Sequence, residues 1–221
     1  TFGVIAVAPS NHDVLWAGTG EQNNRQSSSW GDGVFRSIDG GATWTHVGLE
    51  NTRAIGRIVV DPRDPAVAYV AALGNLWQPS PDRGVFKTTD GGRTWTRSLF
   101  VDTLTGVVDM VMDPTDPNTL FAAAYQRLRT PCCFNGGGPG SGIYRSTDGG
   151  ATWQKLSGGL PAGDVGRIGL AMSHTNGKRV YAVIEGPAAG RGGRGGGEDA
   201  SAGGVYRTDD GGSTWTHLNP L

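Results

Sequence analysis

Short runs of apolar residues, separated by tight polar turns, recur along the chain. One example is the apolar run at 55–60, which is followed by an Asp-Pro turn at 61–65 and a second apolar run at 67–72. Apolar runs of this length, bounded by Asp and Pro turns, are typical of β-strands. Counterparts of the two runs stand at 4–8 with 14–17, at 107–112 with 120–124, and at 168–172 with 180–184. The pattern therefore predicts four pairs of antiparallel strands.

An octapeptide with an Asp-Gly-Gly centre and a closing Trp predicts a further strand pair in each repeat. The copies are SIDGGATW at 37–44, TTDGGRTW at 88–95, STDGGATW at 146–153 and TDDGGSTW at 208–215. Each copy follows a strand-like run such as 33–36 and precedes an alternating run such as 45–47. Every repeat is therefore predicted to be a four-stranded antiparallel meander, with strands A to D.

Four such meanders predict a β-propeller. The repeats cover roughly 1–50, 51–101, 102–160 and 161–221. A unit of about 50 residues with four strands is typical of a propeller blade. The predicted fold class is all-β, with residues 1–221 forming one propeller segment of four blades. Because the chain opens with Thr1 and is cut in phase with the repeat, we expect it to be part of a larger protein.

Composition narrows the possible functions. Gly and Pro contribute 38 and 12 of the 221 residues, which excludes long helices over most of the chain. The net charge is −1 and the basic residues are dispersed, so no nucleic acid partner is expected. No apolar stretch reaches the length of a membrane-spanning helix, so no membrane insertion is expected.

The octapeptide itself has a structural interpretation. Its Asp can accept hydrogen bonds from the backbone that follows, the Gly pair supplies positive φ values, and the Trp ring can pack against the sheet. The distal Glu and the alternating carboxylates of a calcium loop do not follow, so no metal is expected. The residues assigned to this structural role are Asp39, Asp90, Asp148, Asp210, Trp44, Trp95, Trp153 and Trp215.

These four octapeptides resemble the Asp-box, or BNR repeat, of sialidases, of two-propeller xyloglucanase-type glycoside hydrolases and of sortilin-type receptors. The chain is most similar to secreted bacterial BNR-repeat proteins of glycosyl-hydrolase type. The resemblance implies peripheral boxes, an extracytoplasmic location (secreted or periplasmic), and further blades or other chains that complete the ring. Sialidase activity is disfavoured, because the Arg-Ile-Pro motif is absent from the sequence. Fold resemblance alone does not supply an activity.

The long B to C connections are where a ligand is expected to bind. In a meander, the tight A to B and C to D turns lie on one face, and the variable B to C loops lie on the other. The loops are expected at 18–32, 74–83, 126–141 and 186–203. Aromatic and guanidinium side chains in them suit sugar rings or anions. The predicted ligand-binding residues are Trp30, Trp77, Arg25, Arg127 and Arg129.

A glycoside hydrolase would need two carboxyl groups on the same variable face. The candidate catalytic residues are Asp102, Asp109, Asp164, Glu21 and Glu185. Solvated charges or ion pairs are the alternative. For Asp109, pairing with Arg57 or Arg167 of the neighbouring repeats is as plausible as catalysis.

Other chemistries find little support. The four His residues fall at turns or in outer strands, away from the variable face, which disfavours nucleophilic catalysis and a His-ligated metal. Cys132 and Cys133 are adjacent, and a bond between them would close a strained ring. Free thiols or a bond to another chain are the alternatives.

The leading functional hypothesis is an extracytoplasmic Asp-box propeller that acts as a binding or interaction module through its B to C loops, without a cofactor. Its ligand would be a polysaccharide or a protein. A xyloglucanase-like glycoside hydrolase that acts on polysaccharide is the first alternative, and a structural or assembly protein is the second.

Overall fold

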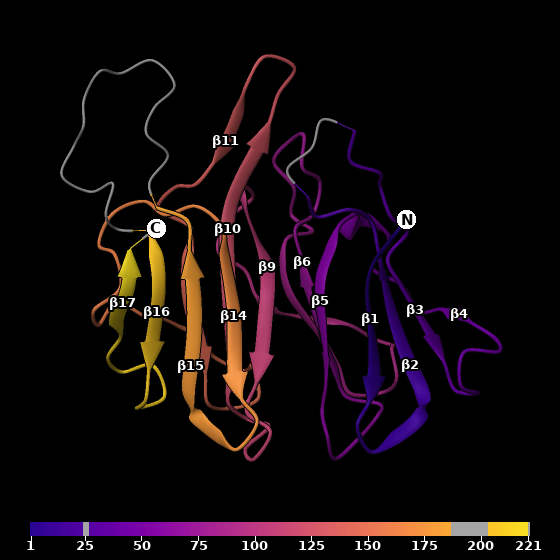
Figure 1. Cartoon of the computed structure of the whole chain (residues 1–221). Coiled ribbons are helices and arrows are strands. Elements are labelled where there is room, and N and C mark those ends of the chain that lie inside the picture. Colours follow the sequence, from indigo (N-terminus) through magenta and orange to yellow (C-terminus); the bar gives the residue numbers. More distant parts are fainter. Residues whose placement is uncertain (24–26, 187–202, 221) are drawn as a thin grey trace.

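Strands form almost all of the regular structure in this computed structural model, which describes residues 1–23, 27–186 and 203–220 (Figure 1). A single 3-10 turn, η1 (Glu50–Thr52), follows the first sheet in the described part of the chain. The strands of the first two sheets are β1 (Phe2–Ala8), β2 (Asn11–Thr19), β3 (Val34–Ser37) and β4 (Thr45–His46), then β5 (Ile55–Val60), β6 (Ala68–Ala72), β7 (Gly84–Thr88) and β8 (Thr96–Leu99). Those of the third and fourth are β9 (Thr105–Met112), β10 (Leu120–Arg129), β11 (Phe134–Gly136), β12 (Gly142–Ser146) and β13 (Gln154–Lys155), then β14 (Ile168–Ser173), β15 (Asn176–Ile184), β16 (Gly204–Thr208) and β17 (Thr216–Pro220).

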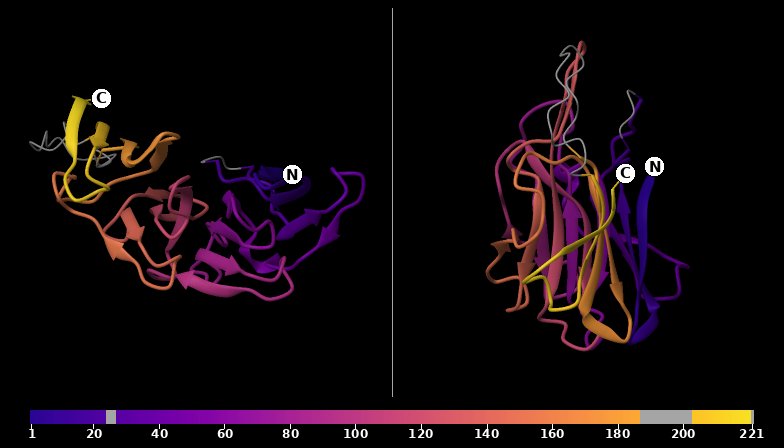
Figure 2. Two further views of the ribbon diagram at one scale, coloured as in Figure 1. Left: turned by 90° about the horizontal axis from the view of Figure 1, so that it is seen from below. Right: turned by 60° about the vertical axis from the view of Figure 1, so that its left-hand side comes forward.

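The four sheets are antiparallel meanders that stand side by side in an open arc (Figure 2). We call the sheets blades 1 to 4. In blades 1, 2 and 4 the strands pair in chain order, and in blade 3 strand β10 pairs with β9 and β12 and also with the added strand β11. The innermost strands β1, β5, β9 and β14 lie next to one another along the arc. The predicted fold class, an all-β propeller segment of four four-stranded blades, is confirmed.

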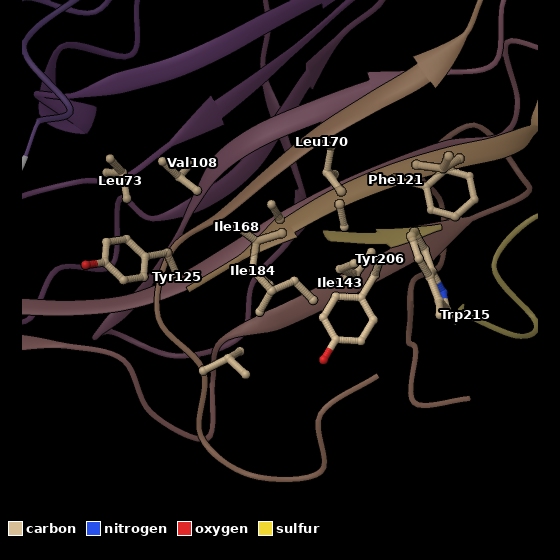
Figure 3. Close-up of a cluster of buried hydrophobic side chains, with 14 of the residues drawn as sticks. Leu73, Val108, Phe121, Tyr125, Ile143, Ile168, Leu170, Ile184, Tyr206 and Trp215 are labelled. Carbon is tan, nitrogen blue, oxygen red and sulfur yellow. The ribbon is translucent and has the colours of Figure 1, made fainter. Parts of the chain in front are cut away.

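Strand B of each inner blade is buried on both faces, because it lies between two neighbouring blades. All five residues of β6 are buried. Its Ala68 and Val70 belong to the core shared with blade 1, whereas Tyr69 and Ala71 belong to the core shared with blade 3. This alternation explains why the sequence of strand B is continuously apolar. The third core, between blades 3 and 4, contains Phe121 and Trp215 (Figure 3).

Each Asp-box closes a tight turn, as the sequence predicted. In the second box, Asp90 Oδ1 accepts the Thr94 amide (2.9 Å) and the Thr88 hydroxyl (2.8 Å), and Oδ2 accepts the Thr94 hydroxyl (2.6 Å). These hydrogen bonds lower the pKa of the Asp90 carboxyl to about 2. Both glycines, Gly91 and Gly92, have positive φ angles of 76° and 88°. The other three boxes repeat these bonds around Asp39, Asp148 and Asp210.

The two kinds of tight turn share one end of the molecule, and the described parts of the first three B to C loops project from the other (Figure 1). The first glycine of each box donates its amide to the A to B turn of its own blade. These pairs are Gly40 to Asp13, Gly91 to Ala66, Gly149 to Asn118 and Gly211 to Lys178. These four hydrogen bonds hold each Asp-box against the A to B turn of its blade. The variable face, which consists of the long loops, lies at the opposite end.

The third B to C connection differs from the prediction. Residues 126–141 were expected to be an irregular loop, but β10 continues to Arg129 and pairs with β11 in a hairpin that extends above the blade (Figure 1). Thr130 and Cys133 exchange backbone hydrogen bonds at its tip. No Gly or Pro interrupts the chain from Leu120 to Thr130, so β10 can extend as far as Arg129.

The adjacent cysteines at the tip of this hairpin are bonded to each other. The structure pairs Cys132 with Cys133 in a disulfide, across Cα atoms 3.8 Å apart. The structure therefore contains neither free thiols at these two positions nor a bond from them to another chain.

Among the described helices, none is long and apolar enough to cross a membrane.

Candidate functional site

The inner strands of the four blades surround a polar cavity of about 210 Å³ on the axis of the arc. Each blade contributes one polar side chain to its lining: Gln22, Arg57, Asp109 and Arg167. Gln22 belongs to the first B to C loop, Arg57 and Asp109 lie in β5 and β9, and Arg167 precedes β14. We call these four residues the axial cluster.

Irregularities in the inner strands place the axial cluster. The pairing of β5 with β6 shifts between Ile55 and Arg57, and the pairing of β9 with β10 shifts directly before Asp109. Such bulges redirect the side chain that follows them. A Cβ atom on Gly56 would lie 2.4 Å from the Val108 carbonyl oxygen, so glycine is required for this close approach.

Asp109 is held in place by three hydrogen bonds. Its Oδ1 accepts Arg57 Nε (2.8 Å) and the Met110 amide (2.9 Å), and its Oδ2 accepts the Leu170 amide (2.8 Å) of blade 4. The Arg57–Asp109 pairing that the repeat positions suggested is thus present. The Asp109 side chain is 16% exposed and the Arg57 side chain 44%. Asp109 therefore joins blades 2, 3 and 4 at the axis.

Gln22 and Arg167 join blades 1 and 4 across the axis. Arg167 Nη2 donates to Gln22 Oε1 (3.1 Å), and Gln22 Nε2 donates to the Gly56 carbonyl (3.4 Å). Arg127, which is 1% exposed, donates to the backbone carbonyls of Gln22 and Asn23. The first B to C loop is thereby tied to each of the other three blades across the axis.

The axial cluster carries an excess of positive charge, since two guanidinium groups face one carboxylate. Within the ranges that the structure describes, Nη1 and Nη2 of Arg57 have no hydrogen-bond partner. The remaining donors can bind an anion in the cavity. Towards the turn face, Arg57 also lines a wider, open cavity of about 550 Å³, whose walls include the apolar side chains of Val59, Val111 and Met172.

The predicted ligand-binding residues have different environments. Arg25 lies outside the described residues. Trp30 is 57% exposed and is covered by the Arg53 guanidinium, 4.1 Å from its ring centre. Trp77 is partly buried against the core between blades 3 and 4. Arg129 lies over the Phe134 ring at 4.7 Å. Their role in binding stays a prediction.

Two arginines of the variable face hold loops in place. Arg83 is fully buried and donates to the carbonyls of Leu104 (2.7 Å) and Asn75 (2.6 Å). Burial lowers the pKa of Arg83 to about 10 and that of Arg127 to about 10. Both guanidinium groups donate to backbone carbonyls, so the contacts that the structure shows for them hold loops in place.

The five candidate carboxylates are dispersed, and Asp109 is the one that lines the axial cavity. Glu21 is 8% exposed and accepts bonds from Asn23 and the Ser29 amide. Asp102 accepts the Leu104 amide at 2.7 Å. The two remaining candidates lie beside blade 4: Glu185, which accepts the Arg167 amide at 3.0 Å, and the exposed Asp164.

The sequence did not single out Gln22, because its role depends on a loop that crosses the axis. Arg57 and Arg167 were recognised as possible partners for Asp109 and as two of several arginines that suit an anion. No group of three or more His, Cys, Asp or Glu residues that could hold a metal ion is found in the described part of the chain.

The Asp-box blades match one protein family. The family model described as sortilin, neurotensin receptor 3 (Sortilin-Vps10) matches residues 32–160, more than half of the chain. The chain therefore belongs to the Sortilin-Vps10 family.

Curated relatives and solved structures extend this likeness to the whole chain. It is 25% identical to a xyloglucanase of Paenibacillus sp, covering 98% of this chain and 21% of the relative. It is also 25% identical to a xyloglucanase of Hypocrea jecorina, covering 100% and 27%. The crystal structure of the GH74 xyloglucanase from Xanthomonas campestris superposes with a TM-score of 0.62 at 20% identity, covering 97% and 29%. The chain thus spans about a quarter of the length of these relatives.

Proposed function

We propose that this chain is a binding module whose ligand places a carboxylate group in the axial cavity, beside Gln22 of the first B to C loop. The observation that carries the proposal is the axial cluster. Arg57 has unused donors there, and Arg167 contributes a second guanidinium group. Two planar forks in a partly enclosed site match the geometry of a carboxylate.

The walls around the axial cluster favour a ligand that is apolar next to its carboxylate. Arg57 also lines the wider cavity of about 550 Å³, whose walls include aliphatic side chains such as Val111 and Met172. Burial of apolar groups there would add to the charge-assisted hydrogen bonds. A peptide with an apolar C-terminus has this chemistry. The description of the matched family as a receptor supports a binding role.

An extracytoplasmic location is part of the proposal. The disulfide between Cys132 and Cys133 supports it, because disulfides persist in oxidising compartments. The exposed hairpin that carries this disulfide would then be a further contact surface on the loop face.

Titration calorimetry with two matched probes tests the binding proposal. The probes are a short apolar peptide with a free C-terminal carboxylate and the same peptide as its amide. We expect the carboxylate form to bind more tightly, and Arg167→Gln to weaken its binding about tenfold or more, as for a lost charge-assisted hydrogen bond. Arg93→Gln is the matched control, because Arg93 is exposed in the second Asp-box on the opposite face.

Arg167→Gln is preferred to a change at Arg57, because Arg57 is the partner of the Asp109 carboxylate. Equal affinity for the two peptides, or equal loss in Arg167→Gln and Arg93→Gln, would contradict a carboxylate site at the axis. Thermal melts of both variants establish that the fold is intact.

A glycoside hydrolase is the second candidate, supported by the names of the xyloglucanase relatives. Because Asp109 is the one candidate carboxylate in the axial cavity and is fully hydrogen-bonded, the geometry supports binding better than catalysis. Assays on xyloglucan oligosaccharides with wild type, Asp102→Asn, Asp109→Asn and Asp164→Asn are expected to show no turnover. Turnover that one of these variants abolishes would establish the hydrolase instead.

A further inference from the structure

A second cavity, of about 290 Å³, lies between blades 3 and 4, and we call it the lateral cavity. None of the four residues of the axial cluster lines it, although Ile168 lines both cavities. Three of its wall residues, Ile143, Ile168 and Ile184, lie next to one another in Figure 3. The aliphatic residues of its wall are Ile143, Leu156, Leu160, Val165, Ile168 and Ile184.

The connection between blades 3 and 4 leaves room for the lateral cavity. Residues 156–167 connect β13 to β14, whereas 100–104 are sufficient to connect β8 to β9 in the preceding pair of blades. Several residues of the longer connection line the cavity, and one of them is Gly163. A Cβ atom on Gly163 would have no neighbour within 4 Å. The connection therefore bends around a space that its own side chains do not fill.

One substitution between the repeats accounts for part of this space. Arg97 and Lys155 occupy the same position in β8 and β13, because each is paired with the aromatic residue of strand C. Two residues further along, Ser157 is therefore equivalent to Leu99. Leu99 is 7% exposed and belongs to the core between blades 2 and 3, whereas Ser157 lines the lateral cavity. A short hydroxyl side chain thus stands where the preceding blade has a core leucine.

Lys155 places a positive charge at the rim of the lateral cavity. Its side chain lies over Gly142, where a Cβ atom would be 2.6 Å from Lys155 Cε. Its Nζ donates to the Pro139 carbonyl (2.7 Å), and in the described part of the chain this is the one hydrogen bond of the ammonium group. Partial burial lowers the pKa of Lys155, and the nearby Asp164 opposes that shift. Because an ammonium group has three donors, donors remain for a bound anion.

The lining of the lateral cavity indicates what kind of ligand fits it. Its walls are aliphatic, and none of the described residues that line it is aromatic, so it lacks the ring surface on which a sugar would stack. Its volume is at the lower end of the range of ligand pockets, which begins at roughly 300 Å³. The charged group at its rim is a cation. A small aliphatic molecule with an acidic end matches these three properties.

We propose that the lateral cavity binds a free medium-chain aliphatic carboxylate. The hydrocarbon chain lies against Ile143, Ile168 and Ile184, and the carboxylate accepts a charge-assisted hydrogen bond from Lys155. Burial of the chain drives binding, and Lys155 orients the ligand with its acidic end at the rim. This site is separate from the axial cluster, so it does not depend on the function proposed above.

Titration calorimetry of the chain with octanoate and with octanamide tests the role of Lys155. We expect octanoate to bind more tightly, and Lys155→Gln to weaken octanoate binding about threefold to tenfold, as for a partly exposed charge pair. The affinity for octanamide should change little. Lys178→Gln is the matched control, because Lys178 is exposed beside the A to B turn of blade 4.

Filling the cavity gives a second, independent test. Ser157→Leu introduces the side chain that Leu99 provides in the preceding blade, and it should weaken octanoate binding at least tenfold. Because the new side chain fills an apolar space, Tm should stay the same or rise. Ser157→Ala removes the hydroxyl group without filling the space, and it should bind octanoate as the wild type does.

Three outcomes would overturn the proposal. One is the absence of saturable octanoate binding at every concentration below micelle formation. Another is binding that Ser157→Leu leaves unchanged, or that Lys155→Gln weakens equally for octanoate and octanamide. The third is octanoate binding that Arg167→Gln abolishes and Ser157→Leu does not, because that would place the acid in the axial cavity. Thermal melts establish that each variant is folded.

Discussion

Replacing Ile58 by Ala is the most direct test of the packing between blades. Ile58 is 4% exposed and lies in the core that joins blades 1 and 2, together with Trp16 and Val34. Ile5 occupies the equivalent position in blade 1 and is 59% exposed. Ile5→Ala therefore removes the same atoms from the same kind of strand, with little burial.

The expected cost follows from the atoms removed. Three buried carbon groups at about 0.8 kcal/mol each give about 2.4 kcal/mol of lost transfer free energy. Incomplete relaxation around Trp16 adds a cavity contribution, so that Ile58→Ala should lower the free energy of unfolding by about 3 to 4 kcal/mol. For Ile5→Ala, the exposed fraction reduces the loss to about 1 kcal/mol or less.

Urea unfolding at low protein concentration, followed by circular dichroism, provides the measurement. Ile58→Ala should shift the midpoint to lower urea with little change in the slope m, and Ile5→Ala should shift it much less. For a chain of this size the larger loss corresponds to a fall in Tm of about 6 to 16 °C. Equal shifts in the two variants would refute the assignment of this position to the inter-blade core.

Other expectations concern the boxes and one buried hydroxyl. Asp90→Ala should lower Tm without changing ligand affinity, because three hydrogen bonds in the turn are lost far from the loop face; a change in affinity at constant Tm would contradict its peripheral role. Hydrogen bonding lowers the pKa of Asp39, Asp90 and Asp148 in the folded protein to about 2. Their contribution to the free energy of unfolding is therefore complete above the unfolded pKa of about 4, and it is lost as the pH falls towards 2. Melts between pH 2 and 7 should show this decline, which Asp90→Ala should reduce. Tyr69→Phe removes the bond to the Gly149 carbonyl (2.9 Å) and should cost about 0.5 to 1.5 kcal/mol in urea unfolding, whereas Tyr181→Phe, at the equivalent position of the last blade, should cost less.

Local sequence was sufficient for the fold, because each blade is assembled from short-range interactions. Asp90, Gly91, Gly92 and Thr94 close their turn within five residues, so the octapeptide alone predicts the hairpin. Alternation and Asp-Pro turns define the other strands, and repetition then predicts the arc. The hairpin of β10 and β11 was missed, because turn-rich residues around Pro131 also fit an irregular loop.

The repeat positions suggested that Asp109 would pair with Arg57, but tertiary structure decided the other polar contacts at the axis. Asp109 touches Arg57 and Leu170, which are 52 and 61 residues away, and Gln22 reaches Arg167 across 145 residues. No local pattern encodes such distances, because they depend on how many blades separate the residues around the axis. The same applies to Arg127, which looked like a ligand contact and is buried against the first loop. The repeated box determines each blade from its own sequence, whereas the site depends on single, non-repeated side chains that only the packing of four blades brings together.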